Sequence, residues 1–159
     1  MSELSHVDAG GAARMVDVSG KESTARQAVA TGVFRTTAEV IALLLADGLP
    51  KGDVLATARI AGIMAAKRTA DLVPLCHPIA LGGVRVELTP VIDRIEITAT
   101  VSTTDRTGVE MEALTAVAVA GLTLHDMVKA LDPVAVLDAV RVERKDGGKA
   151  GTWIRTEER

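Results

Sequence analysis

An acidic and a basic side chain stand one helical turn apart near the end of the longest helical pattern in the chain. Asp126 and Lys129 are three residues apart, so on a helix they face the same way. An ammonium group beside a carboxylate favours its ionised form and shifts the pKa of both groups, which suits proton transfer. Ordinary surface ion pairs share this spacing. The pattern alone therefore leaves a catalytic and a structural interpretation open.

Two carboxylates, Glu110 and Glu112, open the same helical pattern. Acidic residues in a first turn stabilise a helix through its dipole, but they can equally accept hydrogen bonds from an amino-heterocycle such as guanine. Glu112 and Asp126 are 14 residues apart, which is about 21 Å along a helix. One small ligand cannot touch both within one subunit. Either they contact different ends of a long ligand, or two subunits share the site.

Three lysines stand where an anion could bind. Lys51 comes just before Asp53, an expected helix N-terminus, where backbone N–H groups attract anions. Lys145 and Lys149 lie in a Gly-rich stretch, residues 145–151, which is predicted to be a flexible loop that can fold over a ligand. Each lysine alone is typical of a solvated surface, but together they favour a small polyanionic ligand.

The sequence predicts no metal site and no cofactor. Its three histidines are His6, His77 and His125, and none has a zinc-site spacing relative to the single cysteine, Cys76. Cys76 and His77 are adjacent, so on an extended chain their side chains diverge. Walker and dinucleotide-binding glycine motifs are absent, and one cysteine excludes an internal disulfide.

Composition narrows the class of protein. The 159 residues fit a single domain, 1–159, with a net charge of −3 and only two aromatic side chains, which argues against nucleic-acid binding. No apolar run is expected to reach the roughly 20 residues of a membrane helix. The polar start resembles no signal peptide, so we expect a cytoplasmic protein. An apolar content of 48% predicts an oligomer interface.

The periodicity of apolar residues predicts the elements that must position these groups. A loose arm, residues 1–13, precedes a strand over 23–35 and a helix that starts with a capping box at Thr36 and Glu39. A second helix is expected over 53–71. A hairpin over 84–101 with its turn at 90–93, a helix over 109–131 and a strand over 134–142 complete the list. The order β-α-α-β-β-α-β predicts an α+β fold, with a mostly antiparallel sheet packed against helices in a ferredoxin-like arrangement.

Eight short segments occur in a characteristic order along nearly the whole chain. They are HVD (6–8), MVDV (15–18), KGDV (51–54), ARIAG (58–62), AAKRT (65–69), PLCHP (74–78), GVEMEALT (108–115) and DMVKA (126–130). Together they resemble the molybdenum-cofactor biosynthesis protein C family, the cyclic pyranopterin monophosphate synthases. The resemblance implies conversion of a 3′,8-cyclised dihydroguanosine triphosphate into cyclic pyranopterin monophosphate and diphosphate, without a redox cofactor. It also implies a hexamer, a trimer of dimers with active sites at the dimer interface.

Roles for individual residues follow from the same resemblance. It implies that Asp126 is the catalytic acid or base, with Lys129 and Lys51 as its partners. His125 departs from the larger aromatic residue that family members often carry before this aspartate. Arg26 matches a further family contact. The implied substrate-binding residues are Leu75, Cys76, His77, Glu110, Met111, Glu112, Lys145 and Lys149.

Two other functions stay open on the residues alone. A metal-dependent enzyme acting on the GTP ring could use Cys76 and His77, and stoichiometric zinc in the purified protein would favour it. A non-enzymatic module could bind a nucleotide as a regulator, and it would not need Asp126 and Lys129 as an acid–base pair.

Overall fold

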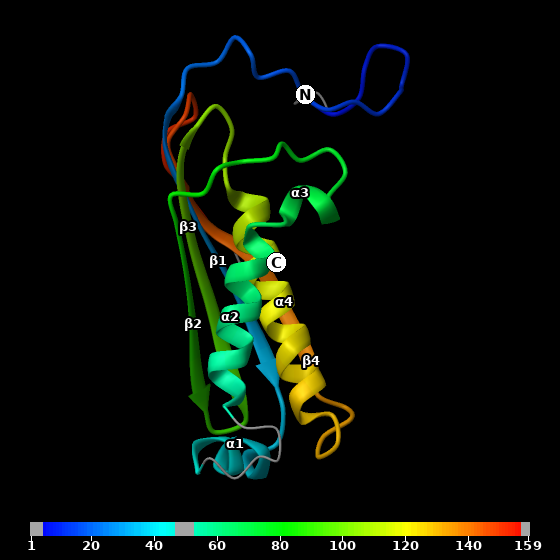
Figure 1. Cartoon of the computed structure of the whole chain (residues 1–159), viewed down its shortest axis with the longest axis vertical. Helices are drawn as coiled ribbons and strands as arrows, with labels where there is room; N and C mark the ends of the chain where they lie inside the picture. The colour runs from blue at the N-terminus through cyan, green and yellow to red at the C-terminus, as the bar shows by residue number, and fades with distance from the viewer. Residues whose placement is uncertain (1–4, 47–52, 157–159) are drawn as a thin grey trace.

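The protein consists of one antiparallel sheet with helices on one of its faces (Figure 1). The computed structural model describes residues 5–46 and 53–156. Neighbouring strands pair in the order β2-β3-β1-β4-β5, and every ladder is antiparallel. The α+β fold is therefore confirmed. The strands are β1 (Thr24–Arg35), β2 (Gly83–Val91), β3 (Arg94–Asp105), β4 (Val136–Asp146) and β5 (Trp153–Ile154).

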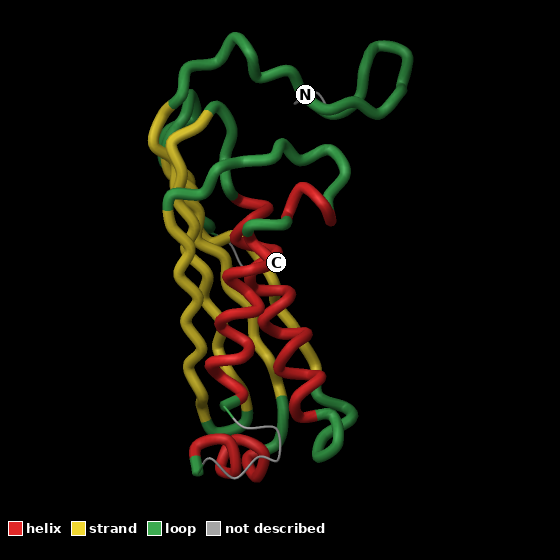
Figure 2. The backbone as a smooth tube through the Cα atoms, viewed as in Figure 1, coloured by secondary structure: helices red, strands yellow, loops and turns green. Residues whose placement is uncertain are grey.

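Two long helices, α2 (Val54–Ala66) and α4 (Glu110–Val128), lie side by side against the sheet (Figure 1). Of the two short helices, α1 (Ala38–Leu45) lies across one end of the molecule and α3 (Thr69–Leu72) lies near the other. Residues 5–23 cross the α3 end as loops and turns, with a single bridge between Val7 and Ala13 (Figure 2).

The core forms because alternate residues of the central strands face the helices. Alternation in β1 buries Ala28, Ala30 and Phe34, and alternation in β3 buries Ile95 and Ile97 in the same way. Against them packs the apolar face of α4, whose fully buried hydrophobic residues are Ala113, Ala116, Val117, Ala120, Leu124 and Val128. Small side chains let α2 and α4 approach closely, so both helices fit on a sheet of this width.

The predicted capping box at the start of the first helix is wrong. The N-cap of α1 is Thr37, whose side chain accepts a hydrogen bond from the Val40 N–H at 3.2 Å. The Thr36 hydroxyl instead donates to Asp132 Oδ2 at 2.8 Å. Asp132 is buried in the turn after α4, and a buried carboxylate needs such a partner. Thr36 therefore forms a tertiary hydrogen bond with Asp132 instead of the helix cap that the local pattern predicted.

Other helix and strand boundaries also differ from the predicted ones. The predicted helix over 53–71 is two helices, because Arg68 leaves helical geometry with ψ at 16° and α3 starts anew at Thr69. In the hairpin, Pro90 belongs to β2, so the turn is shorter than predicted. The long helix ends at Val128 rather than at residue 131.

The last long strand lies further along the chain than the prediction over 134–142. Pairing with β1 extends β4 to Asp146, with Lys145 opposite Ala28. Lys145 is thus a strand residue, and the prediction that it lies in the Gly-rich loop is wrong. The two-residue strand β5, which the sequence did not reveal, pairs Trp153 with Lys145.

Helix α4 is the described segment that bears on the expectation about apolar runs. By length and composition it could cross a membrane, since it has 19 residues and an 18-residue stretch of it has a mean hydropathy of 1.3. In the fold, 44% of that stretch is buried, and the helix packs on the sheet and against α2. The central helix of a globular core passes the same test, so α4 is weak evidence for a membrane span.

Candidate active site

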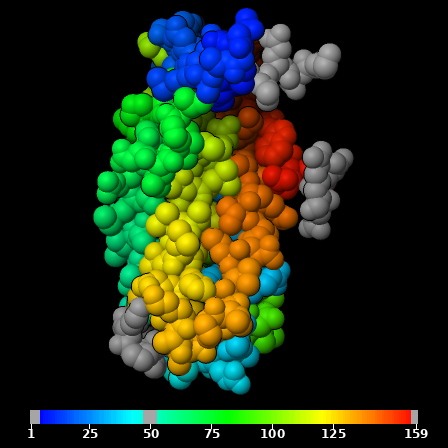
Figure 3. Space-filling view, turned by 90° about the vertical axis from the view of Figure 1, so that its right-hand side faces the viewer, coloured from blue at the N-terminus to red at the C-terminus, as the bar shows by residue number. Residues whose placement is uncertain are grey.

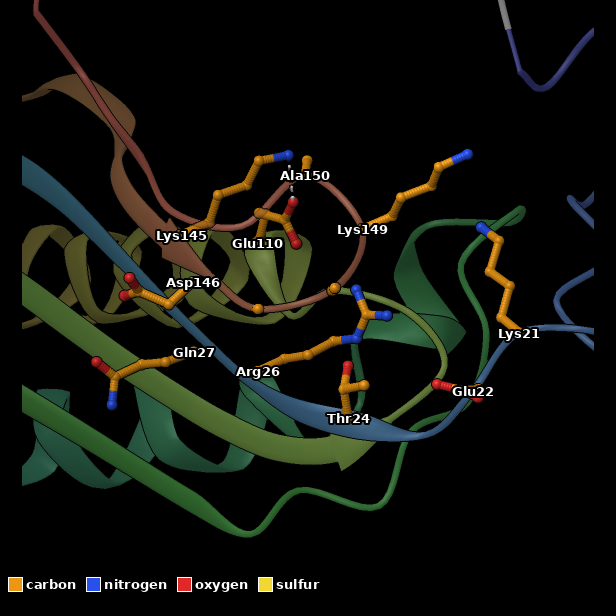
Figure 4. A pocket seen from close by; sticks show the side chains of 13 residues that line it. Lys21, Glu22, Thr24, Arg26, Gln27, Glu110, Lys145, Asp146, Lys149 and Ala150 are labelled. Atoms are coloured by element: carbon orange, nitrogen blue, oxygen red, sulfur yellow. Dashed lines mark hydrogen bonds and ion pairs between the residues drawn. The ribbon is translucent and has the colours of Figure 1, made fainter.

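A cavity of about 620 Å³ opens where β1 begins, α4 begins and β4 ends (Figure 4). We call it the basic cavity, because four cationic side chains line it from two separate parts of the chain. Its carboxylates are Glu22, Glu110 and Asp146. The cations are Lys21, Arg26, Lys145 and Lys149.

Hydrogen bonds hold two of these cations in place. Arg26 Nε donates to the Asp105 carbonyl oxygen at 3.0 Å, and Nη2 donates to the Arg106 carbonyl oxygen at 3.2 Å. Lys145 Nζ donates to Glu110 Oε1 at 3.1 Å, which joins β4 to the first turn of α4. The cavity therefore presents cations whose positions are set by the sheet and the helix.

Glycines bring the loop after β4 onto β1. Gly147 and Gly148 have φ values of +94° and +71°, a backbone conformation that residues other than glycine rarely adopt. A Cβ at Gly147 would collide with the Ala25 carbonyl oxygen, and one at Gly148 would collide with the Arg26 guanidinium. The loop thus lies directly on β1, which places Lys149 at the cavity.

A second cavity of about 230 Å³, here called the Cys76 cavity, adjoins the first. Gly108 and Glu110 line both cavities, so the two share a wall at the start of α4. His6 also lines the Cys76 cavity. It contains six of the predicted substrate-binding residues, which come from the loop after α3 and from the start of α4: Leu75, Cys76, His77, Glu110, Met111 and Glu112.

Burial shapes the chemistry of the Cys76 cavity. Glu112 is only 3% exposed, and this burial raises its pKa; the nearby charge of Glu110 acts in the same direction, while a backbone hydrogen bond opposes them. Burial likewise raises the pKa of the Cys76 thiol, with a further contribution from Glu112. Both shifts favour neutral groups, and a neutral carboxyl or thiol can donate a hydrogen bond to a heterocycle.

Asp126 and Lys129 lie in neither cavity. Lys129 Nζ donates to Asp126 Oδ1 at 2.7 Å at the far end of α4, and both side chains are more than half exposed. Lys51 lies outside the described residues. The start of α2, which follows Lys51 in the sequence, is at the same end of the molecule as the end of α4 (Figure 1). The structure thus brings the eight predicted binding residues together and leaves the predicted catalytic pair at the opposite end.

Lys21 and Thr24 are among the residues of the basic cavity that sequence reasoning missed. Thr24 had a usable signal, because the period of two in β1 places it on the same strand face as Arg26. Lys21 lies before the first strand, where no helix or strand periodicity predicts its position, so only the tertiary structure shows that it lines the cavity. Among the described residues, no three His, Cys, Asp or Glu side chains come together as a possible metal site.

Fold and cavities define an α+β protein with a basic, nucleotide-sized cavity at the end of its sheet. Residues 15–148 match the MoaC family. The chain is 65% identical over 153 residues to cyclic pyranopterin monophosphate synthase 2 of Mycobacterium bovis, covering 96% of this chain and 92% of that one. Cyclic pyranopterin monophosphate synthase of Streptomyces coelicolor is 63% identical (96% and 90%), and that of Novosphingobium aromaticivorans is 58% identical (96% and 98%). The chain belongs to the MoaC family.

Proposed function

We propose that this protein is a cyclic pyranopterin monophosphate synthase, a lyase of molybdenum cofactor biosynthesis. Its substrate is a 3′,8-cyclised dihydroguanosine triphosphate, and its products are cyclic pyranopterin monophosphate and diphosphate. The names of relatives 58–65% identical over 96% of the chain support this assignment. The observation that carries it is a four-cation cavity that adjoins a cavity with a buried carboxyl group, the two sharing Gly108 and Glu110.

The two cavities match the two parts of such a substrate. The triphosphate chain lies in the basic cavity, where Lys145 and Lys149 neutralise its charge. The guanine-derived ring lies in the Cys76 cavity, where Leu75 and Met111 provide apolar contact. Glu112, Cys76 and His77 provide hydrogen bonds there, and Glu110 orients Lys145 between the two parts.

Asp126 acts as the acid or base of the rearrangement, with Lys129 and Lys51 as its partners. Lys129 Nζ donates to Asp126 Oδ1 at 2.7 Å, so the two proposed proton-transfer groups are in direct contact. About 21 Å of helix separates Asp126 from Glu112. We therefore assign Asp126 and Lys129 to the active site of a neighbouring subunit, so that each site uses opposite ends of two chains.

A shared site requires an oligomer, and we propose a hexamer built as a trimer of dimers. In Figure 3, α4 (yellow) and β4 (orange) lie side by side on one open face of the molecule. Exposed apolar side chains occur on these two elements and on the turn between them: Leu122, Leu131, Val134 and Val136. Such a surface favours burial against another copy. We place the enzyme in the cytoplasm.

The direct test supplies the cyclised triphosphate to protein stripped of metal. We expect diphosphate and cyclic pyranopterin monophosphate to appear together and in equal amounts, measured by chromatography and mass spectrometry. If binding occurs without product, the protein is a regulatory nucleotide-binding module. If turnover returns only with stoichiometric zinc, it is a metal-dependent enzyme acting on the ring.

A further inference from the structure

One buried oxygen in the wall of the basic cavity has no hydrogen-bond partner. Among the described residues, Thr24 Oγ1 is the only shielded side-chain oxygen or nitrogen without one. A buried hydroxyl left unpaired destabilises the folded protein, and such groups are uncommon. By contrast, the Thr31 hydroxyl on the same strand donates to Glu143 Oε1 at 2.7 Å. The unpaired hydroxyl is therefore a property of this position rather than of the strand.

Thr24 stands among the groups that attract an anion. It and Arg26 are two residues apart on β1, so their side chains share one face, and both line the basic cavity (Figure 4). Figure 4 shows the Thr24 hydroxyl turned toward the Arg26 side chain. Arg26 Nε is already engaged by the Asp105 carbonyl oxygen. The hydroxyl thus lies beside a fixed cation, with its own donor unused.

We infer that Thr24 Oγ1 donates a hydrogen bond to a phosphate oxygen of the bound ligand, which makes Thr24 a further binding residue of the proposed function. A threonine side chain has staggered rotamers, and a change of one rotamer exchanges the positions of Oγ1 and Cγ2. Since Thr24 lines the cavity while its Oγ1 is shielded, the inference requires this rotation to turn the hydroxyl toward the ligand. A hydroxyl bonded to a charged phosphate oxygen forms a stronger hydrogen bond than a neutral pair does.

The test compares ligand affinity with stability in three variants. Inorganic triphosphate is the probe, titrated by calorimetry, and thermal unfolding is measured without it. Thr24→Val keeps the shape and removes the hydroxyl; we expect its Kd to rise about tenfold or more, because a hydrogen bond to a charged group is lost. Its melting temperature stays equal or rises, since the hydroxyl it removes is unpaired in the free protein. Thr24→Ser keeps the hydroxyl and should bind nearly as the unaltered protein does.

Thr31→Val is the matched control on β1. It removes a hydroxyl that is paired in the free protein, so its melting temperature should fall while its Kd for triphosphate stays the same. An unchanged Kd in Thr24→Val overturns the inference, and so does a lower melting temperature or a failure to fold, since either means that the hydroxyl stabilises the free protein. No triphosphate binding by the unaltered protein also overturns it. The proposed function is judged separately, by product formation in the unaltered protein.

Discussion

At the scale of residues, the central prediction is that Asp126 is the acid or base of the reaction. If it transfers protons, Asp126→Asn should lower the rate of product formation at least about a hundredfold, the usual loss when general acid–base catalysis is removed. Substrate should still bind, because both cavities that we assign to it are at the other end of α4. Single-turnover product formation beside calorimetric binding measures both effects.

Asp71→Asn is the control for this variant. Asp71 forms an exposed ion pair with Arg68 that has the same i, i+3 spacing, at 3.3 Å. Exposed pairs of this kind contribute below about 1 kcal/mol, so its rate should match that of the unaltered protein. Normal turnover in Asp126→Asn would remove Asp126 from the mechanism.

Glu112 gives a prediction about pH. Burial raises its pKa in the folded state above the ordinary value of 4.5, so the folded protein binds this proton more tightly than the unfolded chain does. The stability that this provides is complete below 4.5 and is lost as pH rises through the folded pKa. The free energy of unfolding should therefore fall over that window, relative to that of Glu112→Gln.

Chemical denaturation of both proteins across the pH range measures this difference. Equal m-values in the two proteins are the control, since they show that the same surface is exposed on unfolding. A difference that stays constant with pH, or that has the opposite sign, would mean that Glu112 is not held in a raised-pKa state.

At the scale of elements, the contact between α2 and α4 helps to position α4, whose first turn lines both cavities. A Cβ on Gly62 would lie 2.9 Å from the Ala116 carbonyl oxygen and 3.3 Å from Ala120 Cβ. Because the nearest atom is backbone, it cannot rotate away. Gly62→Ala should lower the free energy of unfolding by about 1–3 kcal/mol, the usual effect of overpacking.

Gly20→Ala is the control for this variant, because a Cβ there would meet nothing within 4 Å. Its free energy of unfolding should change by less than about 0.5 kcal/mol. Equal stability of the two variants in a denaturant titration would mean that the helices separate easily.

At the scale of the whole molecule, light scattering tests the assembly. We expect about six subunits per particle at micromolar concentration, in keeping with closed symmetry. The exposed apolar residues of α4, β4 and the turn between them provide the driving force. A monomer that retains full activity would contradict both the hexamer and the shared site.

Mixing two inactive variants tests the shared site directly. Asp126→Asn alters one end of the chain and His77→Ala alters the other. If each site uses opposite ends of two chains, a mixed dimer has one site with both changes and one intact site. Random mixing by co-expression should then restore about a quarter of the normal activity. Mixing after separate folding, without subunit exchange, is the control, and no recovery on co-expression would place each site within one chain.

Much of the fold could be predicted because its signals are local. The period of two located β1, and Asp53 is the N-cap of α2, accepting a hydrogen bond from the Ala56 N–H at 2.8 Å. The order of the long elements, and hence the α+β class, followed from such patterns. The separation of Glu112 from Asp126 also followed, since the rise of a helix is a local property.

Where local signals compete with distant ones, the tertiary structure decided. Thr36 does not cap the helix as predicted, because its hydroxyl donates a hydrogen bond to the buried Asp132, far along the chain. Lys145 became a strand residue because β1 offered it a partner at Ala28.

The sequence by itself determined the fold class, the family resemblance and six of the residues that line the Cys76 cavity. Only the tertiary structure joined that cavity to Lys21, Thr24 and Arg26, and left Thr24 Oγ1 unpaired. The physical reason is that periodicity and caps act over a few residues of chain. Cavities and buried polar groups instead depend on which distant segments the sheet register and helix packing bring into contact.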